Sequence, residues 1–166
     1  MGNIFKVRGK IKVLPLMIIS NLPLIFGLLV LYLNRCAVIV YNMLDKPTFT
    51  SPLIIFASIW LIMYLLMGIA AYRIYMIRDQ GIDIGNSIFY FLIQLSLSYL
   101  WIFIFFSFRL YGLAFIVNKI MLIFLIITFN KFLRLDRIAA VLLIPHILWI
   151  IYVGVVNFFI WMNNEM

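Results

Sequence analysis

Cysteine, histidine and acidic residues are scarce in this 166-residue chain, which has one cysteine, one histidine and five acidic residues. A lone Cys36 cannot form an internal disulfide. The sequence contains no HExxH or CxxC motif, and a single histidine offers no set of ligands for a metal ion. It also lacks a nucleophile–base pair or paired carboxylates of the kind used in hydrolysis. These absences argue against a disulfide framework, a resident metal and a conventional hydrolytic site.

Hydrophobic residues, by contrast, make up 67% of the chain, whereas soluble domains contain about 45–50%. Because a helix rises about 1.5 Å per residue, an apolar run of about 20 residues crosses a bilayer. Strands are disfavoured because the runs are long and do not alternate apolar with polar residues. The sequence therefore predicts an all-α membrane protein, a single domain over residues 1–166. Its five transmembrane helices are expected at about 13–33, 53–72, 87–108, 110–130 and 138–161.

The net charge of +8 has two explanations, nucleic-acid binding and membrane orientation. With five spans, nine basic residues lie on the side of the N-terminus and three on the other side, which favours orientation by the positive-inside rule. We therefore expect a multi-pass protein of a bacterial cell membrane, with a cytoplasmic N-terminus, an external C-terminus and no nucleic-acid partner. The nine are Lys6, Arg8, Lys10, Lys12, Arg73, Arg78, Lys131, Arg134 and Arg137, and the three are Arg35, Lys46 and Arg109.

The connection between the first two spans, from Asn34 to Pro52, is much longer than the others. Pro47 and Pro52 restrict its backbone, and Pro52 is suited to begin the second helix. Loops of this length commonly cover or bind something, so we expect a semi-rigid cap over a central cavity. An ordinary connector is the alternative.

Aromatic and polar residues share helical faces within three of the spans. Trp60, Trp101 and Trp149 lie well inside their spans, although tryptophan prefers the membrane interface. Such residues need partners for their indole N–H groups. The polar side chains are either contacts between packed helices or parts of an apolar ligand pocket. The faces contain Phe56, Trp60 and Tyr64; Gln94, Ser98 and Trp101; and His146, Trp149 and Asn157.

Two residues within the spans are unusual for a bilayer. Lys119 places a charge inside the fourth span, which indicates either a functional role or a side chain that extends toward the interface. Pro145 removes a backbone hydrogen bond and is expected to kink the fifth helix.

Several segments in order resemble one family. "YNMLDKP" followed by "SPLIIFASIWLIMYLLMG", then "YFLIQLSLSYLWIFIFF", and finally "LDRIAAVLLIPHILW" with "VNFFIWMNN" are similar to the TspO/MBR family of tryptophan-rich sensory and translocator proteins. The resemblance implies a five-helix bundle, usually a homodimer, whose cavity binds tetrapyrroles such as protoporphyrin and haem without an obligatory cofactor. The matching positions are Tyr41, Lys46, Pro47, Pro52, Phe56, Trp60, Tyr64, Gln94, Trp101, Trp149 and Asn157.

The sequence also departs from the family pattern. Ile54 replaces a loop tryptophan, Ser98 an asparagine and His146 a tyrosine, and Ser98 and His146 remain candidate ligand contacts. No lysine or arginine follows Arg137, so sterol binding is not expected. The resemblance implies a membrane sensor, or a transporter, for tetrapyrroles. The alternative is an enzyme that degrades porphyrin in light through its pocket tryptophans.

Overall fold

The computed structural model describes residues 4–7 and 9–165, and five of its helical segments are long and apolar enough to cross a membrane. They are α1 (Val13–Leu33), α3 (Leu53–Arg78), α4 (Gly85–Ile102) with its π-helical continuation η1 (Phe103–Ser107), α5 (Tyr111–Leu135), and α6 (Arg137–Val141) with α7 (Ile144–Asn164). The predicted all-α membrane fold with five spans is therefore confirmed.

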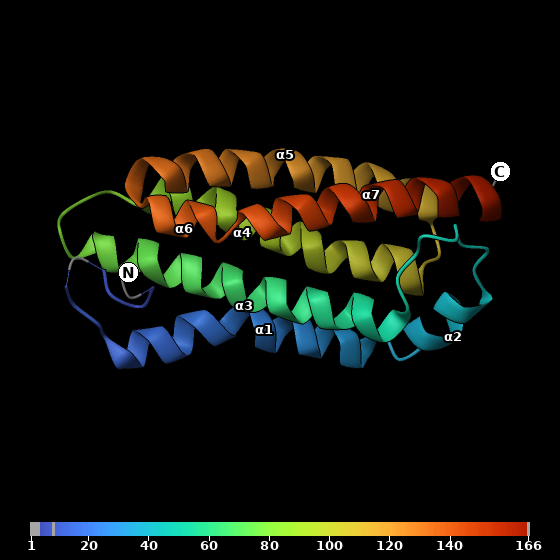
Figure 1. The fold of residues 1–166 in the computed structure, drawn as a ribbon, viewed down its shortest axis with the longest axis horizontal. Coiled ribbons are helices and arrows are strands. Elements are labelled where there is room, and N and C mark those ends of the chain that lie inside the picture. Colours follow the sequence, from blue (N-terminus) through green and yellow to red (C-terminus); the bar gives the residue numbers. More distant parts are fainter. Residues whose placement is uncertain (1–3, 8, 166) are drawn as a thin grey trace.

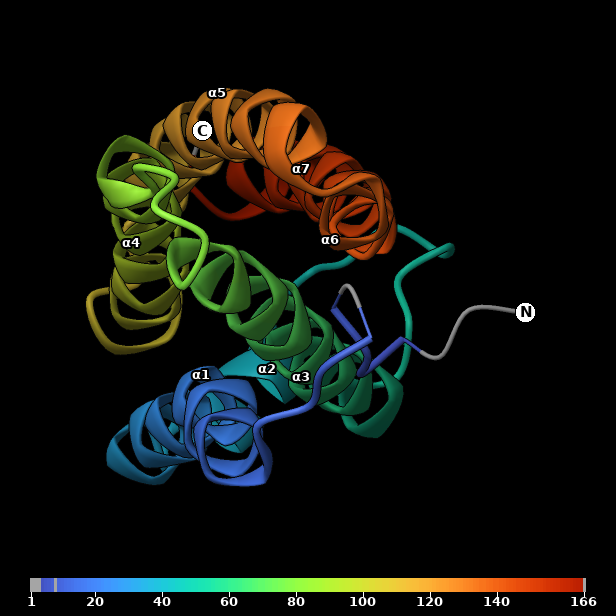
Figure 2. The same cartoon turned by 90° about the vertical axis from the view of Figure 1, so that its left-hand side faces the viewer.

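The bundle is elongated, and its two ends differ (Figure 1). The N-terminal segment and the α5–α6 connection lie at one end, which we call the basic end. The C-terminus, the short helix α2 (Ala37–Met43) and the rest of the first loop lie at the other, which we call the loop end. Viewed from the basic end, α1 lies against α3, outside the group formed by α3, α4, α5 and α7 (Figure 2). The buried core lies among those four helices.

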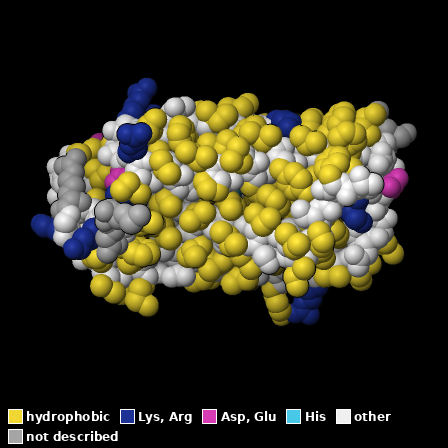
Figure 3. All heavy atoms as spheres, viewed as in Figure 1, with side chains coloured by type: hydrophobic (Ala, Val, Ile, Leu, Met, Phe, Trp, Pro, Cys, Tyr) yellow, Lys and Arg dark blue, Asp and Glu magenta, His cyan; other side chains and the backbone are white. Residues whose placement is uncertain are grey.

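The outer surface matches a lipid environment. Hydrophobic side chains cover the middle of the face in Figure 3, and basic side chains gather near its left edge, the basic end. Helix α1 shows how the outermost span is attached, because it approaches α3 closely. A Cβ added to Gly68 would lie 2.1 Å from the Ser20 carbonyl oxygen, and one added to Gly27 would lie 2.6 Å from the Tyr64 ring. Small residues at such contacts let two membrane helices pack backbone to backbone.

Several helix boundaries differ from the predicted ones. Helix α3 continues to Arg78 and α5 to Leu135; at this end Arg73 of α3 reaches Asp136, the residue that follows α5. The third span ends in a π-helical turn, in which the Phe108 N–H donates to the Phe103 carbonyl. The loop contains α2, which was not expected. Pro145 lies in the first turn of α7, and the break before that helix confirms the expected kink.

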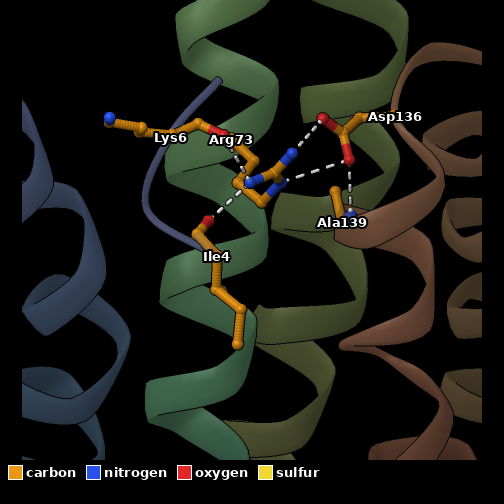
Figure 4. Close-up of polar contacts among 5 residues, drawn as sticks. All are labelled: Ile4, Lys6, Arg73, Asp136 and Ala139. Atoms are coloured by element: carbon orange, nitrogen blue, oxygen red, sulfur yellow. Dashed lines mark hydrogen bonds and ion pairs between the residues drawn. The ribbon is translucent and has the colours of Figure 1, made fainter. Parts of the chain in front are cut away.

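A buried ion pair closes the basic end (Figure 4). Arg73 of α3 donates two hydrogen bonds to Asp136, at 3.1 and 2.7 Å, and also bonds to the carbonyls of Ile4 and Lys6. Asp136 also accepts from the Ala139 N–H at 2.8 Å and so caps α6. Burial opposes ionisation of Asp136, but these hydrogen bonds outweigh it and hold its pKa below the usual value. The pair therefore holds α3, α6 and the N-terminal segment together.

Candidate functional site

The site is an aromatic cluster in the half of the bundle nearer the loop end. Trp60 of α3 lies at its centre: its ring stacks on Trp101 at 5.8 Å and meets Trp149 edge-on at 6.5 Å and His146 edge-on at 5.9 Å. Offset and edge-on geometries are the favourable arrangements for aromatic pairs. The cluster joins three helices that are distant in sequence, and it consists of Phe56, Trp60, Tyr64, Trp101, His146 and Trp149.

One of the three buried tryptophans has a polar partner. The Trp101 indole N–H donates to Asn157 Oδ1 at 3.0 Å, and the Asn157 amide donates to the Tyr111 carbonyl at 2.9 Å. The prediction that polar residues on these faces serve the tryptophans is thus confirmed for this pair. The π-helical turn brings Phe105 beneath Trp101, with 4.9 Å between ring centroids. Trp101 is therefore fixed from several sides.

The other two tryptophans and the histidine have no such partner. Trp60 Nε1, Trp149 Nε1 and both ring nitrogens of His146 are buried without a hydrogen-bond partner among the described residues. His146 is completely buried, and Trp60 is 3% exposed. Unsatisfied groups of this kind are rare, because each costs about 1–3 kcal/mol. Four of the eight such atoms among the described residues lie in this one cluster, so it offers polar groups that a bound molecule can satisfy.

Two predicted site residues lie below this cluster. Ser98 donates to the Leu95 carbonyl at 2.7 Å and lies 3.4 Å from the Tyr64 hydroxyl, so it touches the cluster from beneath. Gln94 is farther down α4, where its amide contacts the Met67 sulfur at 3.3 Å. The Gln94 carbonyl oxygen has no partner among the described residues. Ser98 therefore belongs to the floor of the site, and Gln94 contacts a different layer of the core.

The expected central cavity is not open in this structure. Two small voids adjoin the cluster, one of about 30 Å³ beside Trp60 and Leu31 and one of about 10 Å³ beside Tyr41 and Val153. Pockets for small molecules typically measure about 300–1,000 Å³. The aromatic side chains themselves fill the space, so a ligand enters only if side chains or the first loop move.

The first loop covers the loop end of the cluster and is attached to α7. The Tyr152 hydroxyl accepts from the Ser51 N–H at 3.0 Å, lies 2.9 Å from Ser51 Oγ, and donates to the Phe49 carbonyl at 3.2 Å. Farther along α7, Asn164 exchanges hydrogen bonds with the backbone of Asp45 at 3.1 and 3.0 Å. The expected cap is confirmed in position, and its attachment through Tyr152 and Asn164 was not predicted.

Tyr41 and Lys46 organise the loop from within. The Tyr41 hydroxyl donates to the Ser51 carbonyl, and its ring lies 6.0 Å from that of Phe56. Burial is the main reason why the pKa of Tyr41 rises to about 12, so this hydroxyl stays neutral. The Lys46 ammonium donates to the Tyr41 and Leu44 carbonyls and lies 4.9 Å from the centre of the Tyr41 ring.

The two prolines have different positions. Pro52 precedes the first residue of α3 as its N-cap, and Pro47 accepts a hydrogen bond from the Thr50 N–H in a turn of the loop. Neither is part of the aromatic cluster. Ile54 is 77% exposed, so the missing tryptophan at this position removes nothing from the cluster.

Lys119 lies outside the site, between α5 and α7. Its ammonium lies 4.7 Å from the centre of the Phe115 ring, and a Cβ added to Gly154 would meet it at 2.6 Å. The neighbouring Asn118 Oδ1 is buried without a partner among the described residues. A glycine therefore leaves the space in which this membrane-embedded charge is held.

Comparison with known proteins identifies the family of the chain. The family described as TspO/MBR matches residues 19–162. The chain belongs to the TspO/MBR family. It is 30% identical over 125 residues to the tryptophan-rich protein TspO of Chlorobaculum tepidum, covering 75% of this chain and 78% of that one. It is also 30% identical over 109 residues to the tryptophan-rich sensory protein of Cereibacter sphaeroides, covering 66% of each chain. Translocator protein 2 of the dog is 25% identical over 128 residues, 75% of this chain and 73% of its own.

The TspO/MBR match contains every predicted site residue, and also residues that sequence reasoning missed. Tyr152 and the Arg73–Asp136 pair lie within it. Asp136 precedes a helix and could have been recognised as an N-cap, whereas nothing in the spacing pairs Tyr152 with Ser51. Glu165 follows the matched region. Its carboxylate accepts from the N–H groups of Tyr111 and Gly112 at 3.0 and 2.7 Å and so caps α5.

Proposed function

We propose that this TspO/MBR protein is a membrane-embedded binding protein and sensor for tetrapyrroles such as protoporphyrin or haem. The observation that carries the proposal is the set of unpartnered polar atoms inside the aromatic cluster: the indole N–H groups of Trp60 and Trp149 and the ring nitrogens of His146. They are buried together beneath a loop that is attached by hydrogen bonds. A sensory role is supported by the relative named a tryptophan-rich sensory protein.

A tetrapyrrole suits this cluster for three chemical reasons. Its flat aromatic face can stack on indole rings. Its pyrrole nitrogens and carboxylates offer acceptors for the two indole N–H groups, and His146 can donate to an acceptor or ligate a bound metal. Lys46, in the loop above the cluster, offers a cation for a carboxylate.

Binding requires the closed site to open. The voids beside the cluster are only about 30 and 10 Å³, so side chains or the loop must move before a molecule of this size enters, and we propose that the loop does so by separating from Tyr152. Opening reduces the apparent affinity by the fraction of open molecules. We therefore expect micromolar rather than nanomolar affinity, on the order of −8 kcal/mol.

We also propose an orientation of the protein in the membrane. The basic end faces the cytoplasm by the positive-inside rule, so the N-terminus is cytoplasmic and the loop and C-terminus are external. Tetrapyrroles then reach the site from the outer side. Labelling of the natural Cys36 with a membrane-impermeant maleimide tests this orientation. Reaction in intact cells supports it, and reaction only in inverted vesicles contradicts it.

Titration of the purified protein with protoporphyrin IX tests the function. We expect saturable binding, and the variant Trp149→Phe should weaken it about five-fold, since the lost N–H donor and the smaller ring together cost about 1 kcal/mol. Trp161→Phe is the matched control, because Trp161 lies near the end of α7 and stacks on Phe115, outside the cluster. Absence of saturable binding, or an equal effect of both variants, would contradict the proposal.

A further inference from the structure

A groove lies between α1 and α4 near the basic end, on the membrane-facing side and away from the aromatic cluster. Its volume is about 540 Å³, and its lining is mostly apolar. Ile19 and Leu22 of α1 form one wall, Phe91 and Leu92 of α4 form the other, and Ala71 of α3 lies between them. Leu22 and Leu92 are exposed, so the groove opens toward lipid. Its size falls within the range that binds small molecules, about 300–1,000 Å³.

The groove closes toward the middle of the membrane. There the Tyr99 hydroxyl donates to the Pro23 carbonyl at 2.8 Å, and the rings of Phe26 and Tyr99 lie 6.4 Å apart. Pro23 itself lines the groove. The space between α1 and α4 is therefore an apolar wedge that ends inside the bilayer and is open at the basic end. That shape accepts a hydrocarbon chain inserted from the level of the headgroups.

The open end of the wedge carries a cation. Arg78 lines it at the end of α3, with its guanidinium 5.2 Å from the centre of the Tyr75 ring. Within residues 4–7 and 9–165, the close ion pairs join Lys12 to Asp79 and Arg73 to Asp136, and Arg78 interacts with Asp79 only at longer range. Asp83 also lines the groove, but its carboxylate accepts from the Gly85 N–H at 2.8 Å.

We propose that the wedge between α1 and α4 binds an anionic phospholipid, with an acyl chain against Phe91 and Leu92 and the phosphate on Arg78. Arginine binds phosphate through paired N–H donors, and a guanidinium is stable at the headgroup level while its stem lies along apolar surface. Every membrane-facing surface touches lipid, but this groove should bind anionic headgroups in preference to neutral ones. The proposal is independent of the tetrapyrrole site.

Photoreactive lipids in nanodiscs test it. Phosphatidylglycerol and phosphatidylcholine, each with a diazirine on the acyl chain, are crosslinked to the whole protein, and the products are mapped by mass spectrometry. We expect phosphatidylglycerol to label the peptides around Leu22 and Leu92 about five times more than phosphatidylcholine does, since one basic residue at a membrane surface contributes about a five-fold preference. Arg78→Gln should reduce its labelling to the level of phosphatidylcholine.

Two further variants sharpen the test. Arg134→Gln removes an exposed arginine from the same end, on α5, and should leave labelling at the groove unchanged. Leu92→Trp fills the wedge and should reduce labelling by both lipids. Equal labelling by the two lipids in the wild type would overturn the proposal, as would equal effects of Arg78→Gln and Arg134→Gln. Crosslinks between two copies at Leu22 and Leu92 in place of lipid adducts would also overturn it, because a second chain would then cover the groove.

Discussion

The attachment of the first loop to Tyr152 predicts that a single hydroxyl controls how fast ligand enters. Tyr152→Phe keeps the ring, whose centroid lies 5.1 Å from that of Trp149, and removes only the oxygen. That oxygen makes contacts of 2.9–3.2 Å with Ser51 and Phe49. At about 0.5 kcal/mol for each partly exposed hydrogen bond, the loss is about 1.5 kcal/mol. The open state of the loop then becomes about ten times more populated relative to the closed state.

Stopped-flow mixing with protoporphyrin IX measures the consequence. If opening precedes entry and the open state is rare, the association rate constant is proportional to the open population, so Tyr152→Phe should bind about ten times faster. Tyr32→Phe is the matched control, since Tyr32 is exposed on α1 near the same end. Hydrogen exchange of the backbone N–H of Ser51 should accelerate in parallel. An unchanged association rate together with faster exchange would refute the loop as the gate.

Three other predictions follow from the described contacts. Asp136→Asn should lower the free energy of unfolding by about 3 kcal/mol, because Arg73 stays buried without its counter-charge. Since folding lowers the pKa of Asp136, the stability that this carboxylate contributes is complete above about pH 4 and is lost as the pH falls below that. Thermal unfolding of wild type and variant, measured across acidic pH, tests both effects. Lys119→Met should raise the unfolding free energy by about 1–2 kcal/mol, since it removes a charge from lipid; weaker protoporphyrin binding in this variant would instead give Lys119 a functional role. Illuminated protoporphyrin should lose absorbance no faster with the wild type than with Trp60→Phe, and rapid loss that depends on Trp60 would make the protein an enzyme.

Most of the fold was predictable because lipid imposes simple rules on sequence. The apolar runs, four of them uncharged and one interrupted by Lys119, located all five spans, and the distribution of basic residues separated the two ends. The prediction ended α3 at Tyr72 and α5 at Asn130 because hydropathy decreases there. In the structure both helices continue, since Arg73 reaches Asp136 and the backbone hydrogen bonds continue past the apolar stretch. Hydropathy alone does not contain that information.

The candidate site was predicted in part. Helical spacing placed Trp60, Trp101 and Trp149 on inward faces, and the structure brings their rings together. Spacing could not reveal how the loop is attached, because Ser51 and Tyr152 are far apart in sequence and only the fold joins them. It also could not reveal that side chains fill the cavity, since this depends on rotamers and on the π-helical turn that moves Phe105 under Trp101. The expected homodimer stays a prediction.

The most direct test of the tetrapyrrole site uses the four tryptophans as reporters. In protein labelled with ¹⁵N-tryptophan, each indole N–H gives one NMR signal, and assignment follows from the four Trp→Phe variants. Protoporphyrin IX should shift the signals of Trp60 and Trp149 strongly, through ring currents and new hydrogen bonds. The signal of Trp161, twelve residues beyond Trp149 on α7 and thus about 18 Å farther along the helix, should stay in place. Shifts at Trp161 alone, or no shift at Trp60 and Trp149 when protoporphyrin is bound, would contradict the account.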